Sequence, residues 1–186
     1  MYKLVATDMD ETFLDHGHQI PEANIRAMQR MKELGVLFVP SSGRWYSSIM
    51  DNFAHLDPAL LEGSYVISYN GGFINRVGDP KPLTSCGIGR ACAEELYALG
   101  CELGKCMHVN VADGHVFVCD APEAERTYLE KISGVTHFNS AEHTDLSFLD
   151  GRDIVKVLFM DPDFEGLQQL GLELEPMARR LGVEIT

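Results

Sequence analysis

The segment KLVATDMDETFL (residues 3–14) decides how the N-terminal part of this chain folds. It begins with a short apolar run, Lys3–Thr7, and continues into two acidic residues, Asp8 and Asp10. A run of this length with Leu and Val at its centre is typical of a buried β-strand. The two carboxylates therefore follow the carboxyl end of a strand, where an α/β sheet binds its ligands.

Two further apolar runs, Val36–Val39 and Tyr65–Ser68, are each preceded by a predicted helix, at residues 21–34 and 45–53. The second strand is expected to end before Pro40, because proline lacks the N–H that a sheet uses. Strand, helix, strand, helix, strand is the pattern of a right-handed parallel sheet. The predicted fold class is therefore α/β.

Polar side chains follow all three predicted strands: Asp8 and Asp10 after the first, Ser42 after the second, and Asn70 after the third. Right-handed crossovers bring the ends of neighbouring parallel strands to within about 5 Å per strand. We therefore expect Asp8 and Ser42 to share one small pocket, with the backbone carbonyl of Asp10 facing the same space.

Beyond Gly72 the pattern changes from alternating strands and helices to hairpins, with turn sequences at residues 78–80 (GDP) and 112–114 (ADG). The expected strands are 72–77, 82–86, 108–111, 115–119, 154–160 and the start of another at 183–186, and the expected helices are 88–103, 122–132 and 161–181. This mixture predicts an α+β domain over residues 81–186, following the α/β domain over residues 1–80.

The charge composition of the chain limits the classes of molecule that it is expected to bind. Lys and Arg total 15 against 28 Asp and Glu, which gives a formal net charge of −13. Such a surface repels nucleic acid and anionic membranes, so neither is an expected partner. A small phosphorylated molecule remains compatible with this charge, because a metal ion and a few local donors can hold one phosphate.

The five cysteines follow neither a disulfide framework nor a CxxC metal pattern. No apolar run approaches the roughly 20 residues that a membrane helix needs. The N-terminus leads directly into the first strand, without the pattern of a signal peptide. The expected location is the cytoplasm.

The Asp8–Asp10 pair suits phosphoryl transfer through an aspartyl phosphate. One carboxylate attacks phosphorus, and a second acid protonates the leaving group and later activates water. Mg²⁺ assists this chemistry and prefers carboxylate, carbonyl and water oxygens. A pair of aspartates separated by one residue can also simply cap a turn, so the pair alone leaves both interpretations open.

Three segments, Asp8–Leu14 (DMDETFL), Ser41–Arg44 (SSGR) and Tyr69–Gly72 (YNGG), together resemble the haloacid dehalogenase superfamily. They are most similar to its Cof-type sugar-phosphate phosphatases, which carry a large α/β cap. Val155–Asp161 (VKVLFMD) is similar to a cap strand of that subfamily. The resemblance covers the whole chain in order and spacing. It implies a partial Rossmann-like parallel-sheet core with an α+β cap domain.

The resemblance assigns Asp8 as nucleophile and Mg²⁺ ligand. It assigns Asp10 as general acid and base, with its backbone carbonyl also on the metal. Ser42 then donates its hydroxyl to the phosphoryl oxygens, and Thr12 shapes the turn. Glu11 departs from the pattern, because the family usually has glycine there; a side chain at this position needs a compatible backbone angle.

Gly43, Arg44 and Asn70 complete the expected substrate-binding residues. Arg44 can meet a phosphate through two N–H groups, or it can be an arginine on the surface or between helices. Asn70 can line the substrate pocket or hold a loop. His16 and His18 form a pair in a loop, for which solvation is the simpler interpretation than metal binding.

Two further motifs of the family are absent from these 186 residues: a lysine and an acidic GDxxND loop, which follow the cap. Lys156 does not replace that lysine, because its segment matches the cap. We therefore expect a Mg²⁺-dependent phosphatase of small phosphorylated metabolites, represented by an N-terminal fragment that is inactive alone. The alternatives are a non-catalytic relative that binds a ligand or partner, and a phosphotransferase or mutase of the same superfamily.

Overall fold

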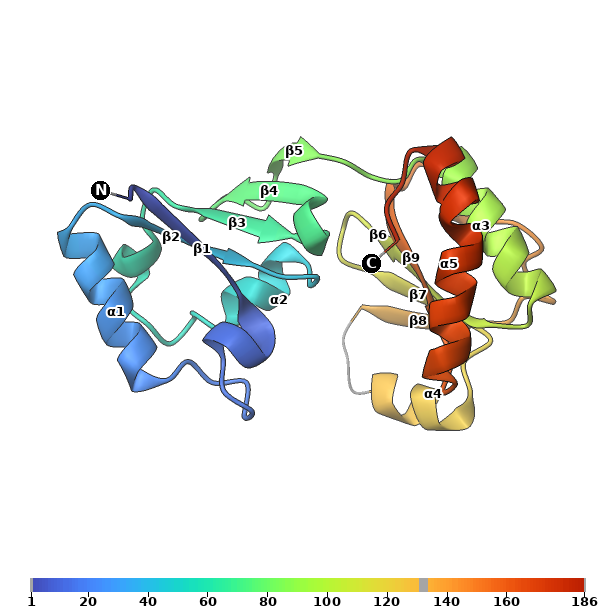
Figure 1. Ribbon diagram of the computed structural model, residues 1–186, viewed down its shortest axis with the longest axis horizontal. Coiled ribbons are helices and arrows are strands. Elements are labelled where there is room, and N and C mark those ends of the chain that lie inside the picture. Colours follow the sequence, from blue (N-terminus) through green and yellow to red (C-terminus); the bar gives the residue numbers. More distant parts are fainter. Residues whose placement is uncertain (1, 131–133, 186) are drawn as a thin grey trace. The chain divides into compact units, whose positions relative to one another are not determined.

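A computed structural model describes residues 2–130 and 134–185 and divides the chain into two compact units, Met1–Cys86 and Gly87–Thr186 (Figure 1). The division falls after Cys86, whereas the sequence predicted a second domain that starts at residue 81. Strand β5 (Pro82–Ser85) pairs with β4 (Phe73–Arg76) and so extends the sheet of the first unit. Each unit has its own sheet and its own apolar core.

The first unit is built on a five-stranded sheet in the order β1-β2-β3-β4-β5. Strands β1 (Leu4–Asp8), β2 (Leu37–Ser41) and β3 (Tyr65–Ser68) run parallel to one another, as predicted. Strand β4 pairs antiparallel with β3, and β5 pairs antiparallel with β4. Helices α1 (Glu22–Glu33) and α2 (Tyr46–Asp51) lie in the connections between the parallel strands (Figure 1). The fold is α/β.

Strand β2 does not end before Pro40, as the sequence had suggested. It continues to Ser41, with Thr7 paired to Pro40 and Asp8 paired to Ser41. Proline removes only an N–H donor, and its fixed φ is compatible with extended backbone. The longer strand places Ser42 immediately beyond the residue that pairs with Asp8.

The core of the first unit lies between the sheet and α1. Met28 of α1, Phe38 of β2 and Val66 of β3 are all buried in one cluster. Phe13, from the turn after β1, packs its ring 4.6 Å from that of Phe38, measured between centroids. Helix α1 forms here because apolar residues recur at helical spacing along one face. This packing fixes the strand ends that carry the polar residues.

Strand β1 lies at the edge of this sheet. Among the described residues it pairs with β2 alone. Its apolar side chains are poorly covered, since Leu4 is 46% exposed and Val5 is 41% exposed. The strand that carries Asp8 is therefore the least supported of the three parallel strands.

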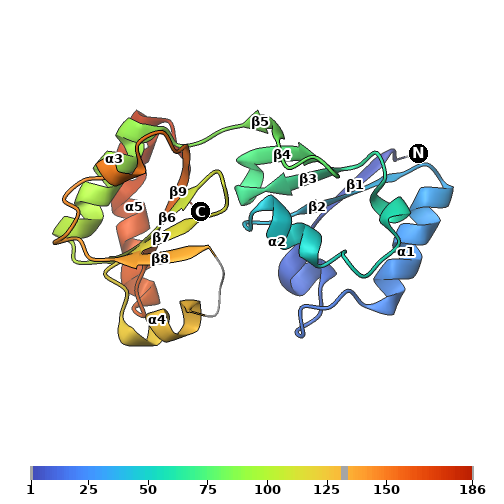
Figure 2. The same cartoon turned by 180° about the vertical axis from the view of Figure 1, so that it is seen from behind.

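The second unit contains a four-stranded sheet in the order β8-β7-β6-β9 (Figure 2). Its strands are β6 (Cys106–Val111), β7 (Val116–Cys119), β8 (Val135–Phe138) and β9 (Ile154–Met160), and its helices are α3 (Arg90–Glu102), α4 (Glu123–Leu129) and α5 (Phe164–Leu181). Strand β6 is antiparallel to both neighbours, whereas β7 and β8 are parallel. This is the predicted α+β architecture.

Two predictions about the second unit need correction. The strand expected at 183–186 is not formed at residues 183–185, because α5 ends at Leu181, Gly182 caps it in a left-handed conformation, and irregular chain follows; Thr186 lies outside the described residues. Helix α4 ends at Leu129, and residues 131 and 132 of its predicted range also lie outside them. No helix in the described part of the chain is long and apolar enough to span a bilayer.

The core of the second unit forms where α3 packs on β6. Tyr97 is 0% exposed, and its hydroxyl donates to the backbone carbonyl of His143 at 2.6 Å. Gly100 lies so close to β6 that a Cβ there would overlap the sulfur of Met107. Glycine at this helix position therefore permits close approach of α3 to the sheet.

Candidate active site

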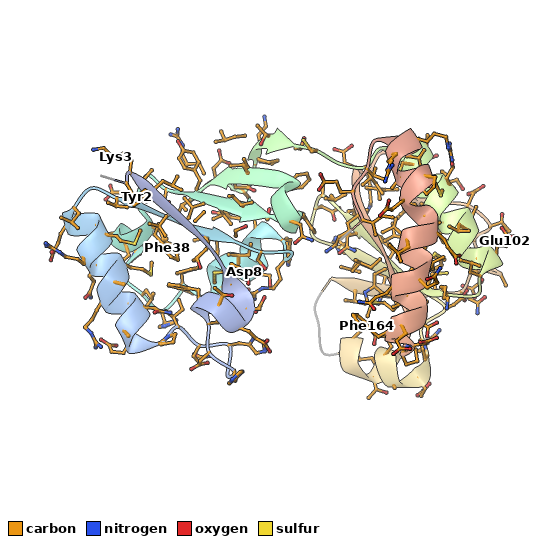
Figure 3. The ribbon with its side chains drawn as sticks, viewed as in Figure 1. Tyr2, Lys3, Asp8, Phe38, Glu102 and Phe164 are labelled. Carbon is orange, nitrogen blue, oxygen red and sulfur yellow. The ribbon has the colours of Figure 1, made fainter. Side chains whose placement is uncertain are left out.

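The ends of the three parallel strands meet at one edge of the first sheet, as predicted. Asp8 is the last residue of β1 and is exposed (Figure 3). The backbone N–H of Ser42 donates to the carbonyl of Ile67 at 3.0 Å, and the N–H of Asn70 donates to the carbonyl of Ser42 at 3.1 Å. That Asp8 and Ser42 line one pocket, with the Asp10 carbonyl facing it, stays a prediction.

The side chain of Asp10 is held from two sides. Its Oδ2 lies 3.3 Å from Nε of Arg44, and its Oδ1 lies 3.4 Å from Nδ1 of His18. The chain around it turns sharply after β1, and Met9 is fully buried beneath this turn. Asp10 is therefore oriented by its neighbours, whereas Asp8 stays open to solvent.

Arg44 connects several parts of the site. Its Nη2 donates to Oδ1 of Asn52 at 2.9 Å, and its backbone N–H donates to the hydroxyl of Ser42 at 3.2 Å. Asn52 in turn donates to the backbone carbonyl of His18 at 3.2 Å. The ion pair with Asp10 is partly solvated and adds little stability, so its main effect is on orientation. Sequence reasoning had named Arg44 but had missed Asn52 and the contact of His18 with Asp10.

Gly43 and Asn70 are in close contact. A Cβ at position 43 would lie 2.7 Å from Oδ1 of Asn70, which is closer than any real side chain tolerates. Asn70 itself has φ 54°, a left-handed conformation that asparagine adopts more readily than most residues. The backbone N–H of Asn70 also binds the carbonyl of Ser42. These contacts favour the loop-holding interpretation of Asn70, and they explain the need for glycine at position 43.

Glu11 occupies the position where the sequence pattern suggested glycine. It has φ 57° and ψ 10°, and its side chain is exposed. Left-handed backbone costs a non-glycine residue about 1–2 kcal/mol. The turn that presents Asp10 is therefore strained at Glu11. A glutamate at a position where the family usually has glycine had indicated such a backbone angle.

Replacing Glu11 by Gly is expected to stabilise the first unit by about 0.5–1 kcal/mol, because the relief of left-handed strain exceeds the added freedom of glycine in the unfolded chain. Urea unfolding at constant pH measures this change. The matched control is Gln29→Gly in the middle of α1, which should lose about 1 kcal/mol. Equal destabilisation by both substitutions would show that the φ of Glu11 is not costly.

The acidic residues at the strand end fit a hard metal ion. Asp8 and Asp10 offer carboxylate and carbonyl oxygens, and Mg²⁺ is usually held by one or two carboxylates with waters and substrate phosphate. Across the described ranges, no group of three or more His, Cys, Asp or Glu residues is arranged to hold a metal. The two aspartates by themselves offer donor types that suit Mg²⁺, which is held in part by waters and substrate phosphate.

Comparison with known sequences identifies relatives. A family model described as haloacid dehalogenase-like hydrolase matches residues 5–182. A Bacillus subtilis (strain 168) protein named "Putative phosphatase YxeH" is 30% identical over 165 residues. The match covers 87% of this chain and 58% of that protein. The chain thus spans less than two thirds of the length of this curated relative.

Solved structures show the same fold. A haloacid dehalogenase-like hydrolase from B. subtilis has a TM-score of 0.72 at 18% identity, covering 93% of this chain and 66% of its own. A haloacid dehalogenase-like hydrolase from Bacteroides thetaiotaomicron has a TM-score of 0.70 at 20% identity, with coverage of 97% and 65%. A sugar phosphatase of haloacid dehalogenase subclass IIB has a TM-score of 0.66 at 19% identity, with coverage of 90% and 62%.

The family match extends over almost the whole chain. This protein belongs to the haloacid dehalogenase-like hydrolases.

Proposed function

We propose that the protein is a Mg²⁺-dependent phosphatase of small phosphorylated metabolites, sugar phosphates in particular, which acts through an aspartyl phosphate on Asp8. The observation that carries this proposal is the arrangement of the two carboxylates. Asp8 is exposed at the end of the strand, and Asp10, two residues later in the chain, forms an ion pair with Arg44. The similarity to a named phosphatase and to a sugar phosphatase structure supports it. Because the chain spans only part of these relatives, the activity of the whole protein is part of the proposal.

In the first half-reaction, a carboxylate oxygen of Asp8 attacks phosphorus and the ester P–O bond breaks. Asp10, in its protonated form, gives its proton to the departing oxygen. In the second half-reaction, the Asp10 carboxylate takes a proton from water, which attacks the same phosphorus and releases inorganic phosphate. Asp8 is then a carboxylate again, and Asp10 again carries a proton.

The residues around the carboxylates have distinct parts in this scheme. The hydroxyl of Ser42 accepts the N–H of Arg44, so its own hydrogen can be donated to a phosphoryl oxygen. Arg44 orients Asp10 and offsets its charge near an incoming phosphate. When bound by Asp8 and the Asp10 carbonyl, Mg²⁺ would neutralise charge on the phosphoryl group.

For residues 1–186 alone we expect a phosphoryl adduct on Asp8 but little steady-state turnover. Losing one preorganised electrostatic partner costs about 10²–10³ in rate, and both the lysine and the acidic loop of the family pattern are absent from this sequence. The chain is incubated with p-nitrophenyl phosphate and a panel of sugar phosphates, with Mg²⁺ or with a chelator. Intact-mass spectrometry then measures the adduct, and released phosphate measures turnover.

The outcomes separate the alternatives. Robust turnover with Mg²⁺ would show that the missing motifs are not needed. The absence of an adduct with every substrate would contradict the proposal and favour a non-catalytic ligand-binding protein. Phosphate transfer to an added sugar, instead of release to water, would identify a phosphotransferase or mutase.

A further inference from the structure

Four side chains from β1's following turn, the next loop and α2 are linked in a closed network. Nε of Arg44 lies 3.3 Å from Oδ2 of Asp10, and Nη2 of Arg44 donates to Oδ1 of Asn52 at 2.9 Å. Nδ2 of Asn52 donates to the backbone carbonyl of His18 at 3.2 Å, and Nδ1 of His18 lies 3.4 Å from Oδ1 of Asp10. We call Asp10, Arg44, Asn52 and His18 the Asp10 network. Both carboxylate oxygens of Asp10 are thereby connected to Asn52.

The contact between Arg44 and Asp10 does not hold itself in place. Nε of Arg44 is buried, yet within the described residues it has no hydrogen bond of good geometry, and the carboxylate of Asp10 is close enough for an ion pair only. A partly solvated ion pair contributes about 0–1 kcal/mol, and the long arginine side chain has many rotamers. The position of the guanidinium therefore depends on its other bonds.

Helix α2 supplies those bonds. The carbonyl of Ser48 and the side chain of Asn52 are four residues apart, so they lie on the same side of this helix and its C-cap. Nη1 of Arg44 donates to the Ser48 carbonyl at 3.5 Å, which is long, whereas the bond from Nη2 to Asn52 has an ordinary length. Because the guanidinium is planar, a bond at Nη2 also fixes the direction of Nε. Asn52 therefore sets the contact of Arg44 with Asp10.

Asn52 also supports the second group that contacts Asp10. His18 has φ 55°, and its N–H donates to the carbonyl of Asp15 at 2.9 Å. Left-handed backbone costs a non-glycine residue about 1–2 kcal/mol, so the surrounding contacts must hold it. The amide of Asn52 provides one of them at the His18 carbonyl. A single side chain thus holds both neighbours of the Asp10 carboxylate.

We propose that Asn52 is a positioning residue, which aims the carboxyl group of Asp10 through Arg44 and His18 and thereby favours esters whose leaving group needs a proton. The inference rests on the proposed function, in which Asp10 protonates the departing oxygen. When the ester P–O bond breaks, its electron pair stays on that oxygen. A sugar alkoxide is strongly basic and leaves only with the proton of Asp10, whereas p-nitrophenolate is weakly basic and leaves without it. Asn52 therefore matters for sugar phosphates and not for aryl phosphates.

The test compares two esters in the first half-reaction. Rapid quenching followed by intact-mass spectrometry measures the rate at which the adduct on Asp8 forms, with Mg²⁺ and saturating glucose 6-phosphate or p-nitrophenyl phosphate. Asn52→Ala should lower the rate with glucose 6-phosphate about 10–100-fold, the effect of misplacing one acid group. The rate with p-nitrophenyl phosphate should change less than about two-fold. A general folding defect would lower both rates by the same factor.

Two further variants serve as controls. Asn24→Ala is matched in residue type, because Nδ2 of Asn24 donates to the carbonyl of Phe13 at 2.8 Å and so supports the turn after β1 without belonging to the Asp10 network. It should change both rates by the same factor. Asn52→Leu keeps a similar volume and favours helix, so it preserves the fold if Asn52→Ala does not. It should show the same selective loss.

The Nε–H group of Arg44 gives a readout that needs no turnover. Its ¹⁵N–¹H signal is identified by its loss in Arg44→Lys. Asn52→Ala should raise the exchange rate of this hydrogen with water about ten-fold, which corresponds to one lost hydrogen bond. Asn24→Ala should leave the exchange rate unchanged.

Equal losses with both esters in the Asn52 variants would overturn the inference while the phosphatase stands, as would an unchanged exchange rate at Arg44. The absence of an adduct in the unsubstituted chain with both esters would instead remove the proposed function and the inference together. A loss confined to glucose 6-phosphate, with faster exchange at Arg44, would establish Asn52 as the residue that aims the acid.

Discussion

Replacing Asp8 by Asn is expected to abolish the phosphoryl adduct and to lower phosphatase turnover about 10⁴–10⁶-fold in any form of the protein that turns over, the scale seen when a nucleophile is removed. The amide has nearly the same shape as the carboxylate but cannot attack phosphorus. Asp8 is exposed, so the substitution should leave the fold intact. Intact-mass spectrometry measures the adduct, and p-nitrophenol release measures turnover.

The control for Asp8→Asn is Asp51→Asn, an exposed aspartate at the end of α2 that should retain full activity. A second comparison is Asp10→Asn. This variant keeps the nucleophile but cannot activate water, so part of the protein should remain trapped as the phosphorylated form. Undiminished turnover in Asp8→Asn would refute the mechanism, and an adduct that persists in Asp8→Asn would place the nucleophile elsewhere.

The largest effect on stability is expected at Tyr97. Its ring is fully buried between α3 and the second sheet, 6.2 Å from the ring of Phe138. Tyr97→Ala should lower the free energy of unfolding by about 3–5 kcal/mol, because the cavity left behind cannot fully collapse. Denaturation in urea, followed by far-UV circular dichroism, measures the loss.

Tyr97→Phe separates the hydroxyl from the ring. Burial raises the pKa of Tyr97, so the hydroxyl stays protonated and donates to the carbonyl of His143. Losing this bond should lower the free energy of unfolding by about 1–2 kcal/mol. Tyr2→Ala, at a residue that is 86% exposed, should have no measurable effect. A Tyr97→Phe loss as large as that of Tyr97→Ala would mean that the hydrogen bond, not the packing, holds α3 in place.

Much of the fold was predictable because its elements are local. Tyr65–Ser68 and Ile154–Met160 are strands over the whole predicted range, since each is a compact apolar run between turn residues. Strand β8 (Val135–Phe138) was missed. It has only four residues, includes His137, and forms by parallel pairing with β7, a contact that no local pattern specifies.

The arrangement of the strand ends was predictable to the same degree. Parallel strands with right-handed crossovers force their carboxyl ends together, so the neighbourhood of Asp8, Ser42 and Asn70 follows from topology. The departure at Glu11 correctly indicated a special backbone angle. The hydrogen bond from Arg44 to Asn52 depends instead on the path of α2 and on side-chain rotamers, which the sequence motifs do not encode.

Under the proposed function, the one-sided pairing of β1 within the described residues links the order of Asp8 to the presence of a ligand. A strand with one hydrogen-bonded neighbour opens locally at a lower free energy than a strand with two, so β1 should fray more readily than β2. Asp8 is carried on this strand, and its carboxylate is in position only while β1 is closed. Under the proposed function, a phosphate that bridges Asp8 and Ser42 binds to the closed population alone, and its apparent affinity is reduced by the fraction of time that the strand spends open.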